Sequence, residues 1–405
     1  MMHRARWGRR ARVVHAVVAG AALAWAGCGA PRSTKSLEVQ RSVSSVAAPV
    51  IASVPEWQPG STRAFIVCLA GFEGEAPGHT SFTTSDRNDT AFAELLARRG
   101  VPRDRTTVLL DGAATTESVR AALERTLAES RPDETLLFYF GSHGGYDAKT
   151  GAHSFSTFDG SLPMEWAIDA IEASFKGDRA MLFSDSCYSG GLVELVQQRG
   201  HRVSYAVLSS AGSHDVAWSG WRFIDVLIRG LEGQSMLDLD QDGQILWSEL
   251  TTYAEHHMAF VASGKPAFTR VGAAMPDFVL TRGVPKKTDP RVGLYREALI
   301  DGSWERVEIL AVDRERLFVH PTSGVTHEAD AWVHASSLRE VTPPRYAKGA
   351  AVEVEYDSKW FPATVLDSFD ELTFAHYEGY SSAWDEWFSP DEIRPRTAAP
   401  ASDRE

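Results

Sequence analysis

The most constraining feature of this sequence is the alternation of short apolar runs with amphipathic segments from Arg63 to about Thr281. Apolar runs of four to six residues are typical of strands buried on both faces, and the segments between them have helical spacing. Strands and helices that alternate in this way form a mainly parallel sheet with helices on both faces. The sequence therefore predicts an α/β fold here. The expected elements are strands at Phe65–Leu69, Thr107–Leu110, Thr135–Phe140, Ala180–Ser184 and Tyr205–Ser209, and helices at Asp89–Arg99 and Thr116–Ser130.

Two of these strands run directly into residues that carry chemistry. One is followed by His143 and the other by Cys187. Because the carboxyl ends of parallel strands meet at one edge of a sheet, we expect the two side chains to lie together. A thiol beside an imidazole is suited to nucleophilic catalysis, with the imidazole moving the proton. The backbone N–H groups of Gly144 and Cys187 are the expected oxyanion donors.

The order and spacing of these residues resemble those of a known family. His143 precedes Cys187 by 44 residues, close to the caspase-type separation of about fifty. Asp185–Gly190 reads Asp-x-Cys-x-Ser-Gly, and Phe140–Gly144 resembles the family's strand-then-Ser-Gly-His-Gly with Ser and Gly exchanged. The region from Phe65 to about Tyr253 thus resembles the caspase-like cysteine peptidases of clan CD (peptidase C14), and it looks closer to bacterial metacaspase-type members than to animal caspases. The resemblance implies a caspase-like fold and an endopeptidase that requires no cofactor.

The same resemblance implies an acidic pocket for the P1 side chain, the residue before the scissile bond. Its carboxylates are those matching Asp89 and Asp185, and Asp86 is expected to add to the acidity. Two carboxylates would select Arg or Lys at P1. Ser209 lies in a Leu-Ser-Ser-Ala-Gly run that looks like the strand lining the family's substrate groove. The alternative is that Asp89 and Asp185 only cap the elements that follow them.

An acidic loop downstream matches the EF-hand pattern. The expected ligands are Asp238, Asp240, Asp242, Gln244 and Glu249, with Gly243 at the sharp turn. Oxygen donors in this spacing are typical of a calcium site. The alternative is a tight acidic turn in which the aspartates bond to backbone amides.

The chain changes character after Pro285-Lys286-Lys287, where two segments repeat with a period near fifty-six residues. Trp304 and Trp360 keep this separation, as do His320 and His376. Short alternating runs predict two small SH3-like β-barrels. The second resembles a Tudor-knot or chromo-barrel domain, whose aromatic residues would either cage a cationic ligand or serve as core. We expect a peptide, a protein or an envelope polymer as its ligand.

The N-terminus reads as a targeting segment. A basic stretch, an apolar stretch from Val13 to Trp25 and Ala26-Gly27-Cys28 resemble a bacterial lipobox, which implies lipidation of Cys28; the alternative is a plain signal peptide. Lipidation implies a cell-envelope location, with the membrane contacted through the anchor only. The predicted domains are a signal peptide at 1–27, a flexible tether at 28–61, the peptidase domain at 62–283, and barrels at 290–342 and 344–397.

The balance of charge excludes one class of partner and leaves three classes of function open. A formal net charge of −13 supplies no broad basic surface, so nucleic acid is not expected as a partner. The leading interpretation is a cysteine endopeptidase that cleaves after Arg or Lys. The alternatives are a catalytically silent caspase-like scaffold that presents the barrels, and an acyl-transferring or ligase-type enzyme built on the same two residues.

Overall fold

The computed structural model describes residues 54–73, 81–82, 87–217, 222–262, 266–322, 330–339, 346–356 and 358–396. Cys28, the targeting segment and Asp86 lie outside these ranges. The packed chain begins before the expected boundary at residue 62, because Trp57 is buried and its backbone N–H donates to Val279 O at 2.9 Å. No helix within the described ranges has the length and apolar character needed to cross a membrane.

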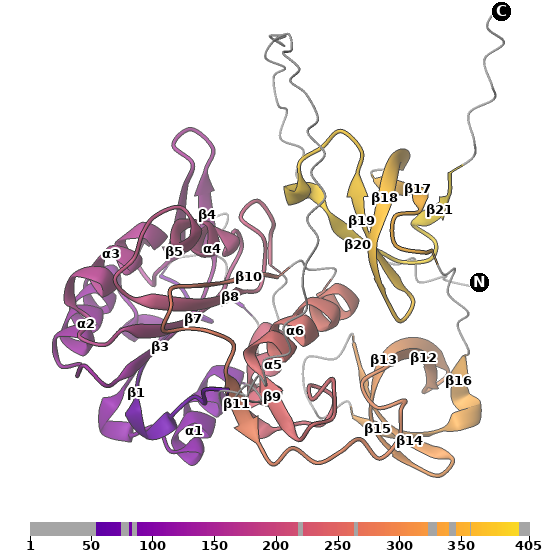
Figure 1. Ribbon diagram of the computed structural model, residues 1–405, viewed down its shortest axis with the longest axis horizontal. Helices are drawn as coiled ribbons and strands as arrows, with labels where there is room; N and C mark the ends of the chain where they lie inside the picture. The colour runs from indigo at the N-terminus through magenta and orange to yellow at the C-terminus, as the bar shows by residue number, and fades with distance from the viewer. Residues whose placement is uncertain are drawn as a thin grey trace, which may run out of the picture. The chain divides into compact units, whose positions relative to one another are not determined.

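A six-stranded sheet forms the centre of the α/β region (Figure 1). Its strand order is β10-β8-β7-β3-β1-β2, with every pair parallel except β10 with β8. The mainly parallel sheet predicted from the apolar runs is confirmed, whereas the antiparallel edge strand β10 was not predicted. The strands are β1 (Thr62–Cys68), β2 (Thr106–Leu110), β3 (Thr135–Gly141), β7 (Arg179–Asp185), β8 (Ser204–Ser209) and β10 (Ala267–Val271).

Helices cover both faces of this sheet (Figure 1). Alternate strand residues point to opposite faces, so Ile66 and Tyr139 pack with α1, α5 and α6, while Phe65 and Phe138 pack with α2, α3 and α4. The predicted end of α1 is confirmed, since Gly100 adopts a φ of 102°. The helices are α1 (Asn88–Arg99), α2 (Thr116–Ala128), α3 (Met164–Ser174), α4 (Gly190–Gln197), α5 (Arg222–Glu232) and α6 (Trp247–Ala262).

The α/β region also contains two small antiparallel sheets. The first follows His143 directly and has the order β4-β5-β6, from β4 (Gly144–Asp147), β5 (Ala152–Ser156) and β6 (Ser161–Pro163). The second pairs β9 (Gln244–Leu246) with β11 (Val279–Arg282). Neither sheet was predicted, because both are built from very short strands.

The C-terminal region contains two five-stranded antiparallel sheets with the same strand order. Each long second strand carries a bulge, between Ile309 and Ala311 in one sheet and between Val365 and Asp367 in the other. The first three strands of the two sheets begin 56 residues apart and the last two begin 55 residues apart. The first C-terminal sheet, ordered β15-β14-β13-β12-β16, contains β12 (Tyr295–Ile300), β13 (Ser303–Asp313), β14 (Arg316–Pro321), β15 (Ala331–His334) and β16 (Leu338–Arg339). The second, ordered β20-β19-β18-β17-β21, contains β17 (Ala351–Tyr356), β18 (Lys359–Phe369), β19 (Leu372–Tyr377), β20 (Glu386–Phe388) and β21 (Ile393–Pro395).

Candidate active site

Strand register places His143 and Cys187 at the same level of the central sheet. The last paired residues of β3 and β7 are Gly141 and Asp185, which are direct partners in the parallel ladder. His143 and Cys187 each lie two residues beyond this pair. The Ser142 N–H also donates to Asp185 O at 3.0 Å, which extends the pairing of the two chains past the strand ends.

Gly144 lies directly against the backbone of Cys187. A Cβ atom at this position would come within 1.9 Å of Cys187 O and 3.0 Å of its carbonyl carbon, so no side chain fits here. Absence of a side chain lets the Gly144 amide approach the thiol. The two predicted oxyanion donors, the N–H groups of Gly144 and Cys187, both act on the Cys187 thiol.

The Cys187 side chain is partly buried at the start of a short turn. Burial raises the pKa of its thiol above the ordinary value, and the backbone groups of Ala217, Cys187 and Gly144 act in the opposite direction. The next residue, Tyr188, has a φ of 59° and donates its N–H to Asp215 O at 2.7 Å. A thiol with a raised pKa is mostly protonated at neutral pH, so nucleophilic attack requires a base beside it.

Aromatic rings hold the imidazole of His143. The ring centroids of Phe82 and Phe72 lie 4.3 Å and 5.0 Å from that of His143. The backbone carbonyl of His143 accepts the Ser156 N–H at 2.9 Å and the Ser142 hydroxyl at 2.7 Å. These contacts fix the backbone of His143 between β3 and the β4–β5 hairpin.

The exchange of Gly and Ser before His143 has a physical reason in the packing. A Cβ at residue 141 would lie 2.8 Å from Tyr139 Oη and 3.1 Å from Cys68 Sγ, so a side chain there would displace one of them. Ser142 instead turns its hydroxyl to the backbone. Glycine is therefore required at the first of these two positions by the residues beneath it.

A row of residues at the carboxyl ends of β1, β3 and β7 precedes His143 and Cys187 and brings several polar groups together. Cys68, Gly141 and Asp185 are partners across β1, β3 and β7, and Tyr139 donates a long hydrogen bond of 3.5 Å to Asp185 Oδ2. Burial raises the pKa of Asp185 to about 6. Burial, together with Asp89, raises the pKa of the Cys68 thiol well above its ordinary value, so this buried thiol stays protonated.

Asp89, at the first turn of α1, borders the same row and is fully buried. Its carboxylate accepts hydrogen bonds from Arg87 Nη2 at 2.5 Å, from Arg87 Nε at 3.0 Å and from the Thr90 N–H at 2.8 Å. Arg87 also donates to Asp111 Oδ2 at 2.6 Å. Asp89 and Asp185 were predicted for this part of the molecule, whereas Arg87 was not, because it belongs to none of the motifs that carry the resemblance.

Ser209 is fully buried at the end of β8. Its hydroxyl donates to Ala267 O at 3.0 Å and to Ala211 O at 2.9 Å, which ties β8 to the edge strand β10. These bonds give Ser209 a structural role at the junction of β8 and β10, and its predicted part in lining the substrate groove stays a prediction.

A cluster of aromatic and imidazole rings beside Cys187 was not anticipated. Tyr146 of β4 lies 4.9 Å from His153 of β5, 5.0 Å from His214 and 5.9 Å from Tyr188, between ring centroids. These rings come together only when the β4–β5 hairpin folds back over the sheet edge. Their spacing in the sequence carries no signal that would have found them.

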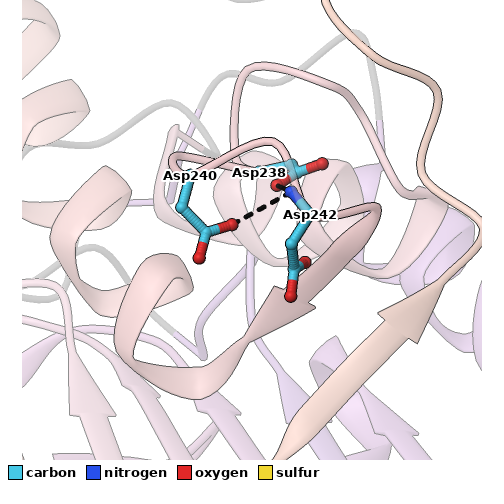
Figure 2. Close-up of side chains that lie close together, drawn as sticks. All are labelled: Asp238, Asp240 and Asp242. Atoms are coloured by element: carbon cyan, nitrogen blue, oxygen red, sulfur yellow. Dashed lines mark hydrogen bonds between the residues drawn. The ribbon is translucent and has the colours of Figure 1, made fainter.

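The acidic loop between α5 and α6 brings three carboxylates together (Figure 2). Ligand atoms of Asp238, Asp240 and Asp242 lie within 4.8 Å of one another. Their oxygens also accept loop amides, as in the bond from the Asp242 N–H to Asp240 Oδ1 at 3.1 Å that Figure 2 draws. Glu249 turns its carboxylate to the N–H groups of Leu239 and Leu246, at 2.7 and 2.9 Å. An all-oxygen donor set fits calcium, although Glu249 would have to leave these amides to become a ligand.

Comparison with known proteins finds solved structures that resemble this chain at low sequence identity. No protein-family model matches the sequence, and no curated protein matches it significantly. Among solved structures, protein GSU0716 from Geobacter sulfurreducens is 17% identical, with 53% of this chain and 94% of that chain covered at a TM-score of 0.40. Caspase-1 from Spodoptera frugiperda is 13% identical, with 60% of this chain and 98% of that chain covered, also at a TM-score of 0.40. Likenesses of this size do not decide a function, which we infer from the residues themselves.

Proposed function

We propose that the α/β region is a caspase-like cysteine peptidase domain in which Cys187 is the nucleophile and His143 moves the proton. The observation that carries this proposal is the register of β3 and β7, which sets both residues two positions beyond one paired row. The close approach of Gly144 to Cys187 supports it, because two backbone amides then converge on one point.

The chemistry follows from these positions. His143 takes the thiol proton, and Cys187 Sγ attacks the scissile carbonyl carbon while the two amides stabilise the negative oxygen. The amine leaves with the proton from His143, and a thioester remains on Cys187. Water, deprotonated by His143, then hydrolyses the thioester and restores the thiol.

We propose that the carboxylates of Asp89 and Asp185 favour a basic P1 side chain. Asp185 lies two residues before the nucleophile, and two carboxylates near Cys68 suit a guanidinium or ammonium group. A bound cation would also favour the ionised form of Asp185, whose pKa burial raises to about 6.

Hydrolysis of fluorogenic peptides with Arg, Lys or Asp at P1 tests the proposal. We expect cleavage after Arg and Lys by the wild type and a loss of at least about a thousandfold in Cys187→Ala, as for other residues that form the covalent intermediate. Arg103→Gln, which changes an exposed side chain outside the proposed pocket, is the control and should keep its activity. Absence of Cys187-dependent cleavage for every peptide would favour the silent scaffold, and cleavage only after Asp would overturn the acidic pocket.

We propose a calcium site at the acidic loop, carried by the convergence of Asp238, Asp240 and Asp242. Titration calorimetry with Ca²⁺ should show binding by the wild type and at least about tenfold weaker binding by Asp240→Asn, which removes a ligand charge. Equal heats from both proteins would leave the loop as a hydrogen-bonded turn.

We propose that the chain is anchored to a bacterial envelope membrane by lipid on Cys28. The sequence alone supports this, through the small residues before Cys28 and the basic and apolar stretches upstream. Mass spectrometry of the mature N-terminus should find a lipid-modified Cys28, and Cys28→Ser should release the protein from the membrane fraction. An unmodified Cys28 in the mature protein would contradict the proposed lipid anchor.

A further inference from the structure

The pocket proposed to receive a basic P1 side chain already contains a guanidinium group from the chain itself. Arg87 contacts Asp89 through Nε and Nη2 and contacts Asp111 through Nη1. A guanidinium clamped between carboxylates is the same recognition chemistry that a P1 arginine would use. Asp89 therefore cannot give its full charge to a substrate while Arg87 is bound to it.

The three members of this contact differ in exposure. The side chain of Asp89 is fully buried, whereas those of Arg87 and Asp111 are 29% and 36% exposed. Asp111 is held independently, because its Oδ1 accepts the N–H groups of Ala70 and Gly71 at 2.7 and 3.0 Å. Arg87 thus covers a buried carboxylate from the solvent side and is itself secured by an outer carboxylate.

The position of the pair links it to the catalytic residues. Asp89 acts on the Cys68 thiol, and Cys68 is in the same row as Gly141 and Asp185. Asp185 is the last residue of β7 and precedes Cys187 by two residues, at the point where the chain bends into a turn. A side chain that extends from a carbonyl at Cys187 into this row would therefore meet the group that Arg87 now holds.

We propose that Arg87 is an internal competitor for the P1 side chain, so that a basic substrate binds only when Arg87 leaves Asp89. This inference rests on the proposed function for the identity of the pocket. It makes Arg87 the residue that sets how strongly the pocket prefers a basic P1 residue. When only a fraction of the molecules is in the binding-competent state, the apparent affinity for the ligand is reduced by that fraction.

Binding of agmatine, a small guanidinium probe, tests the inference in the Cys187→Ala background, where no turnover occurs. Arg87→Gln should bind agmatine at least about tenfold more tightly than the parent. Asp111→Asn should give a smaller gain, because it weakens only the outer contact while its Oδ1 still accepts the amides of Ala70 and Gly71. Adding Asp89→Asn to Arg87→Gln should abolish the gain. Arg103→Gln, which removes an exposed arginine paired with Glu94, is the matched control and should change nothing.

Two outcomes would overturn the inference. The first is equal or weaker agmatine binding by a folded Arg87→Gln variant, which would mean that Arg87 only supports α1. The second applies if Arg87→Gln does not fold: an unchanged agmatine affinity in Asp111→Asn would lead to the same conclusion. Agmatine binding is measured by titration calorimetry, which does not depend on catalysis. A gain in affinity would therefore support the inference even if Cys187 proved to have no peptidase activity. In an active enzyme, Arg87→Gln should also raise kcat/KM for peptides with Arg at P1 and leave those with Asp at P1 unimproved.

Discussion

The two C-terminal sheets share strand order and bulge, and both stack rings on α6, as Tyr295 of the first sheet does on Phe260 at 4.0 Å. The first sheet has a further link of different chemistry. In the first sheet, Glu308 of β13 is fully buried and accepts from Arg229 Nη1 of α5 at 2.6 Å and from Tyr253 Oη of α6 at 2.8 Å. The counterpart of Glu308 in the second sheet, 56 residues later, is the uncharged Thr364. The first sheet is therefore locked to the helices by a buried ion pair.

The second sheet meets α6 through stacked rings. His256 lies 3.7 Å from Phe369 with an interplanar angle of 5°, and edge-on to Trp387 at 5.6 Å. Burial lowers the pKa of His256 to about 4, so the imidazole is neutral at pH 7. The two sheets thus keep the same internal packing, whereas the residues that contact the α/β region differ between them. The contact residues differ because each set packs against different residues of the helices.

The largest expected effect comes from breaking the buried pair. Glu308→Ala leaves Arg229 buried with Asp225 as its remaining carboxylate partner, so we expect a loss of about 3–5 kcal/mol in the free energy of unfolding. Urea unfolding measures it. Thr364→Ala, at the equivalent position, should cost about 1 kcal/mol or less. Similar losses in both variants would show that the two junctions are equivalent after all.

Acid should weaken the second junction. The folded-state pKa of His256 lies below the unfolded value, so the unfolded chain binds more protons between about pH 6.5 and pH 4, and stability falls as pH drops through this window. The full effect is about 3 kcal/mol. His256→Phe should remove that part of the acid loss in thermal unfolding, while the exposed His334→Gln should keep it. An identical pH profile for His256→Phe and wild type would contradict the stacked, neutral imidazole.

The second sheet carries a cluster of three aromatic rings. Phe361, Tyr377 and Tyr380 lie 5.9 to 6.4 Å apart between centroids with steeply inclined planes, a geometry suited to a cationic group. The first sheet has Glu305 and Pro321 at the positions of Phe361 and Tyr377. We propose this cluster as the ligand site of the second sheet, for a peptide or protein that presents a cation.

Tyr380→Ala tests the ring cluster. Because Tyr380 is 52% exposed, we expect unchanged stability and an about tenfold loss in affinity for tetramethylammonium, measured by fluorescence titration. Trp332→Ala, which removes a 47% exposed ring from the first sheet, is the control. Equal losses in the two variants would mean that exposed rings bind the probe without a site.

The smallest effects should be equal in the two sheets. Arg339 donates to Glu297 at 2.7 Å and covers Trp304 at 4.1 Å, and Arg394 donates to Glu353 at 2.7 Å and covers Trp360 at 4.0 Å. Such exposed pairs contribute about 1 kcal/mol or less. Arg339→Ala and Arg394→Ala should therefore shift the unfolding free energy by the same small amount. A difference of more than about 1 kcal/mol would show that the repeat has diverged inside the sheets as well.

Local patterns in the sequence were sufficient for much of the fold. The buried strands were predicted because both of their faces are apolar. The predicted start of α2 at Thr116 is confirmed, and the side chain of Thr115 caps it by accepting the Ser118 N–H. The period of 56 residues was visible from Trp304 and Trp360 alone. His143 and Cys187 were found because each follows a buried strand directly.

The sequence by itself thus predicted five of the six strands of the central sheet, helices α1 and α2, the repeat and the two residues expected to carry the chemistry. The strands and helices were predicted because each depends on neighbours close in the chain. Only the tertiary structure decided what these residues meet. Arg87 bridges Asp89 to Asp111, 22 residues further along the chain, and Glu308 accepts from Arg229 across 79 residues. Ion pairs of this kind depend on burial and distance in space, and neither is encoded in the spacing of charged residues along a chain.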